Sequence, residues 1–242
     1  MVLKVGHRGA PKQEPENTLV SFMKAVKLGA DMVELDVHLC KSGELIVMHD
    51  ETLDRTTNGK GRIKDKDYSE IKELRTKERK QKISTLDDIF KIMKGMVRFD
   101  VEIKDTAAAN AVIKLIRKHK MEKDVIVSSN YPEALLTVKK KLSKVETALI
   151  YWAAKTMWGE RFFVLFSLLA FPFTKKRILS FAKKADAKYV FMFHMFATKS
   201  FVRHLQKKGF KVGVWVVNEK KRIEEMKNKN VDVIISDYID KL

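Results

Sequence analysis

The sequence predicts an α/β protein in which eight parallel strands close into a TIM (β/α)8 barrel. Three observations favour this fold. Short apolar strands alternate with amphipathic helices along the chain, the length of 242 residues suits one barrel, and no repeat or linker separates a second domain, so residues 1–242 are read as a single domain. An open doubly wound sheet is the alternative, but it would need a glycine-rich dinucleotide loop after a strand, and the sequence has none.

The first strand and helix can be assigned from their ends. Val2 to Gly6 is a short apolar strand that stops at a polar segment. A helix follows, with Asn17 or Thr18 as its N-cap and Gly29 at its end, because these residue types satisfy or terminate the free backbone groups of a helix.

A hairpin comes next. Residues 33–37 alternate apolar and polar side chains, and residues 44–49 return as a second apolar run after the turn signal Lys41-Ser42-Gly43. Pairing across this turn places residue 48 or 49 opposite Asp36. We therefore expect an extra strand beside the second barrel strand, followed by a small polar insertion at about residues 50–83.

The rest of the chain repeats the strand–helix pattern. Further strands are expected at residues 96–104, 125–129, 146–151, 189–193, 212–217 and 231–236. Helices with one apolar face are expected at residues 84–93, 107–118, 132–142, 199–208 and 220–229. The apolar segment 152–185 is expected to be helical, with a break near Pro172.

Composition describes a globular protein with a strong positive charge. Hydrophobic residues make up 45% of the chain, and the formal net charge is +18. This charge favours anionic partners such as phosphate esters, nucleic acid or acidic lipid surfaces, although lysines that recur on helices are typical of solvated helix faces. The single cysteine, Cys40, excludes an intramolecular disulfide and is expected to be structural. No signal peptide is evident, so we expect a cytoplasmic protein.

Polar side chains gather where the first strands end, which is the active-site face of a barrel. Glu34 and Asp36 share one face of the second strand, and Glu102 lies on the neighbouring strand. Three carboxylates together would have raised pKa values without a counter-ion. A hard divalent cation, Mg²⁺, Ca²⁺ or Mn²⁺, would resolve this and is favoured over zinc.

The same face carries groups suited to phosphate chemistry. Arg8 and Lys104 can donate hydrogen bonds to a phosphate, while His7 and His49 can exchange protons near neutral pH. Each motif alone is weak, since a lone histidine or a Glu-x-Asp pair is often structural. Their combination across three segments indicates metal-assisted hydrolysis of a phosphodiester.

With these residues in view, the sequence resembles the glycerophosphodiester phosphodiesterase family. The resemblance runs from residue 5 to residue 237 and is weakest from about Trp152 to Phe196. The matching stretches are His7-Arg8-Gly9, Pro15 to Thr18, Gly29 to Val37, His49-Asp50 with Leu53 to Thr57, Glu102-Ile103-Lys104, Val214 to Asn218 and Val231 to Asp237.

The resemblance implies cleavage of a glycerophosphodiester to glycerol phosphate and an alcohol. His7 and His49 would be the acid–base pair, in an order that the sequence leaves open, as it does the choice between water and the glycerol 2-hydroxyl as nucleophile. The other implied roles are metal binding by Glu34, Asp36 and Glu102, phosphate binding by Arg8 and Lys104, and support of the first loop by Asn17.

Phe162 to Phe173 is the most apolar run, about half the length needed to span a bilayer. It is expected to pack on the barrel, to cover the leaving group of the substrate, or to contact lipid as a peripheral membrane patch. The flanking basic residues suit an anionic surface and are Lys155, Arg161, Lys175, Lys176 and Arg177. Three tryptophans are candidates to line the pocket: Trp152, Trp158 and Trp215.

Three functional hypotheses follow. The first is a metal-dependent phosphodiesterase acting on a small-molecule glycerophosphodiester. The second is a lysophospholipase D-like enzyme acting on lysophospholipids at a membrane surface. The third, a non-catalytic basic binding protein for nucleic acid or membrane, is disfavoured because a binding module has no need of two histidines and three carboxylates together, and we expect no nucleic acid partner. The oligomeric state is left open.

Overall fold

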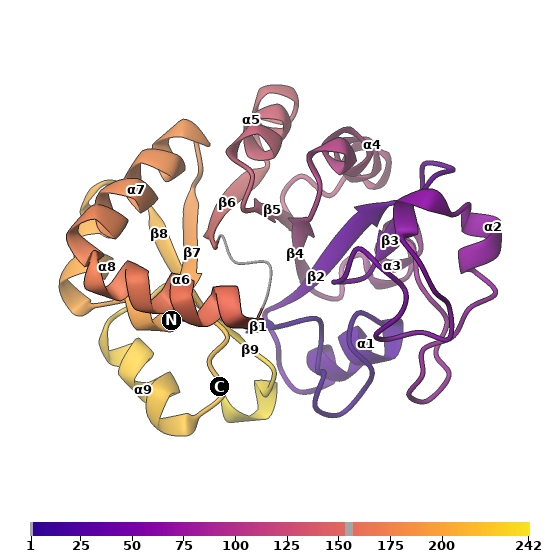
Figure 1. Ribbon diagram of the computed structural model, residues 1–242, viewed down its shortest axis with the longest axis horizontal. Helices are drawn as coiled ribbons and strands as arrows, with labels where there is room; N and C mark the ends of the chain where they lie inside the picture. Colours follow the sequence, from indigo (N-terminus) through magenta and orange to yellow (C-terminus); the bar gives the residue numbers. More distant parts are fainter. Residues whose placement is uncertain (1, 153–156) are drawn as a thin grey trace.

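The computed structural model describes residues 2–152 and 157–242, except for the side chains of residues 157–162, and its strands form the predicted barrel (Figure 1). Eight parallel strands make the ring, and pairing of the first strand with both the second and the last closes it. The ring strands are β1 (Leu3–Gly6), β2 (Met32–Leu39), β4 (Arg98–Ile103), β5 (Val125–Ser129), β6 (Glu146–Tyr151), β7 (Tyr189–Phe193), β8 (Lys211–Trp215) and β9 (Val233–Ser236).

Helices surround the ring in the predicted order. They are α1 (Leu19–Lys27), α3 (Leu86–Met93), α4 (Ala109–His119), α5 (Pro132–Lys141), α6 (Met157–Leu169), α7 (Phe171–Lys184), α8 (Lys199–Lys207) and α9 (Lys220–Asn228). Thr18, one of the two expected caps, accepts a hydrogen bond from the backbone N–H of Ser21 at the start of α1. The expected break near Pro172 is confirmed, because α6 ends just before this proline and α7 begins at Phe171.

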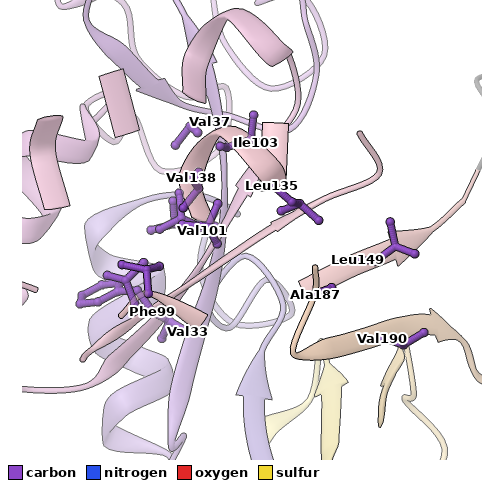
Figure 2. Packing of buried hydrophobic residues seen from close by; sticks show 14 of the residues in the cluster. Val33, Val37, Phe99, Val101, Ile103, Leu135, Val138, Leu149, Ala187 and Val190 are labelled. Carbon is purple, nitrogen blue, oxygen red and sulfur yellow. The ribbon is translucent and has the colours of Figure 1, made fainter. Parts of the chain in front are cut away.

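The main hydrophobic core lies between the strands and the helices. Val33 and Val37 of β2 and Phe99 and Val101 of β4 are fully buried on the outer face of the ring (Figure 2). Successive strand residues point to opposite faces, so the intervening side chains point into the barrel. A second apolar cluster contributes to this interior and consists of Val5, Met32, Ile126, Ala148, Tyr189, Phe191, Val233 and Ile235.

The predicted hairpin strand is present outside the ring. β3 (Leu45–Val47) pairs antiparallel with β2, with Val37 opposite Val47. The backbone N–H of Met48 then donates to the carbonyl oxygen of Asp36 at 3.0 Å. Met48 thus lies opposite Asp36 and His49 follows it directly, in agreement with the predicted pairing of residue 48 or 49 with Asp36.

The insertion after β3 has a small core of its own. It contains a 3-10 turn, η1 (Ile63–Asp65), and a short helix, α2 (Tyr68–Ile71). The side chains that pack together here are all buried and are Cys40, Ile46, Met48, Leu53, Ile63, Ile71 and Ile83. Cys40 is therefore a packing residue, in agreement with its expected structural role. Within residues 2–152 and 157–242, no helix has the length and apolar character needed to cross a bilayer.

The outer core predicts a clear contrast between two phenylalanines. Phe99 is 0% exposed, whereas Phe166 on α6 is 71% exposed. We expect Phe99→Ala to lower the free energy of unfolding by about 3–5 kcal/mol, because it removes buried apolar surface and leaves a cavity. Phe166→Ala should change it by less than about 0.5 kcal/mol. Urea unfolding followed by circular dichroism measures both, and equal effects would contradict this description of the core.

Candidate active site

One open cavity at the carboxyl ends of the strands collects most of the predicted site residues. Its volume is about 1370 Å³. The predicted residues in its lining are His7, Arg8, Glu34, His49, Glu102, Lys104 and Trp215. Asp36 and Asn17 lie behind this lining, where Asp36 is fully buried and joined to Asn17 by hydrogen bonds. The structure thus brings together the two histidines, the three carboxylates, Arg8, Lys104, Asn17 and Trp215.

The carboxylates meet because β2 and β4 are parallel neighbours in register. Asp36 lies beside Glu102, and Glu34 lies beside Asp100. One oxygen from each of Glu34, Asp36 and Glu102 lies within 4.8 Å of the others. The second oxygen of Glu34, Oε2, accepts the backbone N–H of Arg8 at 2.7 Å, whereas its buried Oε1 finds no hydrogen-bond partner within the described part of the chain. Such a set of oxygen donors fits a hard divalent cation.

Burial and charge separate the pKa values of these acids. Burial, and then the negative charges of Asp36 and Glu102, raise the pKa of Glu34 well above its usual range. Burial would also raise the pKa of Asp36, but the positive charges of Lys104 and Arg8 outweigh it and hold this pKa well below its usual range. Asp100, to which the sequence assigned no role, is buried beside them, and burial raises its pKa to about 8.

Asp36 is the centre of the polar contacts. Asn17 Nδ2 donates to its Oδ2 at 2.8 Å, and Arg8 Nε lies 3.5 Å from the same oxygen. Lys104 Nζ forms an ion pair with Asp36 Oδ1 at 3.0 Å and donates to Glu102 Oε1 at 2.7 Å. Arg8 and Asn17 both have left-handed backbone conformations, with φ of 54° and 57°, which turn the loop after β1 back over the end of β2.

Each predicted histidine is paired with a carboxylate. His7 Nδ1 lies 2.7 Å from Asp237 Oδ1, and His49 Nδ1 lies 2.8 Å from Asp50 Oδ1. A carboxylate on Nδ1 fixes the ring orientation and leaves Nε2 for proton exchange. Burial lowers the pKa of His7, and the hydrogen bond to Asp237 opposes this effect. The structure therefore holds two similar His–Asp pairs at one cavity.

Four supporting residues received no individual role from the sequence. Asn218 Nδ2 donates to Asp237 Oδ2 at 2.8 Å and so fixes the partner of His7. Arg55 donates to Asp50 Oδ2 at 2.6 Å and to Glu16 Oε1 at 2.7 Å, and Glu16 Oε1 also accepts from Arg8 at 3.0 Å. These contacts link the pair at His49 to the loop after β1. All four residues, Asp237, Asn218, Arg55 and Glu16, lie inside the motif stretches, but only the folded chain shows what they contact.

The opposite wall of the cavity is aromatic and aliphatic. Trp152 and Trp215 pack edge-to-face with ring centroids 5.0 Å apart, and Phe193 lies about 6 Å from both. Val164 and Leu168 of α6 extend this wall. Trp152 and Trp215 thus line the cavity as expected, while the side chain of Trp158 and the whole of Lys155 lie outside the described residues.

Comparison with known proteins agrees with this geometry. A sequence model of the glycerophosphoryl diester phosphodiesterase family matches residues 7–241. The glycerophosphodiester phosphodiesterase of Caldanaerobacter subterraneus subsp. tengcongensis is 34% identical over 248 residues, which cover 97% of this chain and 93% of that protein.

The chain belongs to the glycerophosphoryl diester phosphodiesterase family. The resemblance noted from the sequence is thus confirmed, and with it the enzyme class.

Solved structures of other phosphodiesterases share the barrel. The glycerophosphodiester phosphodiesterase of Thermotoga maritima is 27% identical, with a TM-score of 0.76 over 99% of this chain and 96% of that chain. A phosphodiesterase of Oleispira antarctica, solved in complex with its product sn-glycerol-3-phosphate, is 23% identical with a TM-score of 0.82, covering 99% of this chain and 94% of that chain. These structural similarities support the barrel fold of this chain.

The contact between His7 and Asp237 predicts a pH effect. Asp237→Asn keeps the shape of the side chain but removes the charge that raises the pKa of His7. We expect kcat/KM for phosphodiester hydrolysis to fall by about 10²-fold or more. The limb of the pH profile that reports His7 should move to lower pH, whether His7 acts as acid or base. Asp240→Asn, at an exposed position three residues away, is the control. An unshifted profile in Asp237→Asn would contradict the pairing.

Proposed function

We propose that this protein hydrolyses glycerophosphodiesters to glycerol phosphate and an alcohol, with a divalent cation held by Glu34, Asp36 and Glu102. The observation that carries the proposal is the cavity itself, whose lining includes Glu34 and Glu102 of the acidic cluster together with His7 and His49. Each of these histidines is paired with an aspartate. The named activity of the Caldanaerobacter relative, which matches nearly the whole chain, supports the same substrate class.

The donor set decides which cation would suit the site. Carboxylate oxygens from Glu34, Asp36 and Glu102 favour Mg²⁺, Ca²⁺ or Mn²⁺. A bound cation would offset the negative charge of the cluster and stabilise charge that develops on the phosphoryl oxygens. Asn17 and the backbone N–H of Arg8 hold Asp36 and Glu34 in place for this role.

The two histidines would divide the proton transfers between them. One ring accepts the proton of the nucleophile at Nε2, and the other gives a proton from Nε2 to the departing alkoxide, so that no net proton is gained or lost by the pair. Asp237 and Asp50 keep the rings in the tautomer that this exchange requires. Arg8 and Lys104 line the same cavity and would bind the phosphate oxygens.

A lysophospholipid is the second candidate substrate. The observation that favours it is the apolar wall formed by Trp152, Phe193, Trp215 and the α6 residues Val164 and Leu168. An acyl chain would bury apolar surface against this wall, whereas a choline or ethanolamine headgroup fills less of it.

The expected cytoplasmic location stays a prediction.

The proposed cation predicts loss of activity on metal removal. EDTA should abolish hydrolysis of glycerophosphocholine and lysophosphatidylcholine, and added Mg²⁺, Ca²⁺ or Mn²⁺ should restore it. Glu34→Gln should weaken cation binding about tenfold or more, measured by calorimetry with the metal alone, because a neutral amide replaces a charged ligand. Full activity in EDTA would contradict a cation site at Glu34, Asp36 and Glu102. The ratio of kcat/KM for the two compounds shows which of the two candidate substrates the enzyme prefers.

The proposed roles of His7 and His49 predict a similar loss of kcat when either histidine is removed. His7→Ala and His49→Ala should each lower kcat by about 10²–10⁴-fold, because each removes one proton transfer. His204→Ala on α8 is the control, because this histidine lies away from the cavity lining as the structure describes it. Wild-type kcat in either cavity variant would remove that residue from the mechanism.

A further inference from the structure

Four large apolar side chains stand exposed together on consecutive helices, and we call them the α6–α7 apolar face. Leu165, Phe166 and Leu169 of α6 are 56%, 71% and 77% exposed, and Phe173 of α7 is 74% exposed. The other large exposed apolar side chains of the described residues are Met23, Ile92, Met96 and Met195. A cluster of this kind is a marker of an interaction surface, because soluble monomers seldom expose contiguous apolar patches.

Basic residues predominate in the segment that carries this face. Residues 161–185 contain no aspartate or glutamate. The same stretch carries six basic residues, which are Arg161, Lys175, Lys176, Arg177, Lys183 and Lys184. Lys176 and Arg177 are exposed one turn beyond Phe173. Lys184 is paired with Glu133 of α5, so the exposed Lys176 and Arg177 carry the charge argument. Exposed apolar side chains beside exposed basic groups match a lipid surface, which offers hydrocarbon beneath negatively charged headgroups.

The face is continuous with the substrate cavity. Leu165 of this face lines that cavity, as do Val164 and Leu168 on the same helix. Figure 1 shows α6 running across the front of the barrel. A flat partner seated on the exposed side of α6 would therefore lie next to the cavity mouth.

Two other occupants fit less well. A second copy of this chain would bring its own basic flank against the first in a two-fold contact, and these like charges would repel. A membrane-spanning role does not suit α6, which has 13 residues where about 20 are needed. An anionic lipid surface matches both the apolar and the basic part of the face.

We propose that the α6–α7 apolar face docks this protein onto an anionic lipid bilayer, with Phe166, Leu169 and Phe173 inserted among the lipids and the cavity mouth turned to the membrane. Membrane binding by this face does not depend on catalysis. Its consequence, access to lysophospholipids in the bilayer, rests on the proposed function.

Vesicle flotation tests the docking directly. The wild-type protein should float with vesicles of phosphatidylcholine and phosphatidylglycerol, and binding should weaken with salt and with pure phosphatidylcholine. The double variant Phe166→Ser/Leu169→Ser should bind these vesicles about tenfold or more weakly. The matched control is Ile92→Ser/Met96→Ser, which removes two exposed apolar side chains from the end of α3 and its following turn and should bind as the wild type does.

A second pair of variants tests the charge. Lys176→Glu should weaken binding to the anionic vesicles, whereas Lys91→Glu, an exposed lysine on α3, should do so much less. Phe166 and Leu169 are exposed and lie outside the cavity lining as described, so hydrolysis of water-soluble glycerophosphocholine should stay at the wild-type level in the double variant. Hydrolysis of lysophosphatidylcholine presented in anionic vesicles should fall with binding.

The outcomes separate this inference from the proposed function. Equal vesicle binding by wild type and the Phe166→Ser/Leu169→Ser variant overturns the docking face, whatever the activity. A wild-type dimer that becomes monomeric in this variant, without vesicle binding, overturns it in favour of a second copy of the chain. If the wild-type protein floats with the anionic vesicles but hydrolyses neither glycerophosphocholine nor lysophosphatidylcholine, the proposed function is wrong and the docking face is unaffected.

Discussion

The structure of the site depends on keeping a carboxylate charged where water cannot reach it. Asp36 is fully buried, and its charge is balanced by Lys104, which directly follows β4, and by Arg8 from the loop after β1. The left-handed backbone at Arg8 and Asn17 serves the same end, because it turns that loop towards β2. The loop also carries His7, so the geometry that satisfies a buried acid places a proton-transfer group as well.

The fold and the centre of the site follow from short-range patterns. Alternation along β2 puts Glu34 and Asp36 on the inner face, and the parallel register with β4 brings Glu102 beside them. The turn signal near Ser42 sets a hairpin whose return strand ends at Val47, two residues before His49. Within β2 and within the hairpin the controlling distance is short, so backbone periodicity predicts which side chains share a face, while the place of Glu102 follows from the order of the strands in the barrel.

Other contacts of the site could not be predicted from the sequence, because they join residues that are far apart along the chain or depend on packing. The hydrogen bond between His7 and Asp237 joins residues 230 positions apart, and it exists only because β9 closes the ring against β1. Arg55 meets Glu16 across 39 positions through an insertion without strong periodicity. An apolar run such as that in α6 is compatible with burial or exposure, and only packing on the barrel decides which side chains remain in solvent.

The hairpin and insertion divide the molecule into parts of unequal local stability. β3 is three residues long and lies outside the ring. Leu45 and Val47 of this strand belong to the main core, whereas Ile46 and the insertion that follows pack in a small cluster of their own. Segments with few long-range contacts open at a lower free energy than the elements of a closed barrel. His49 lies at the start of the insertion, two residues after β3, whereas His7 directly follows the ring strand β1. A folded barrel with one histidine displaced is thus a distinct thermodynamic state, and inactivation of the enzyme need not coincide with its global unfolding.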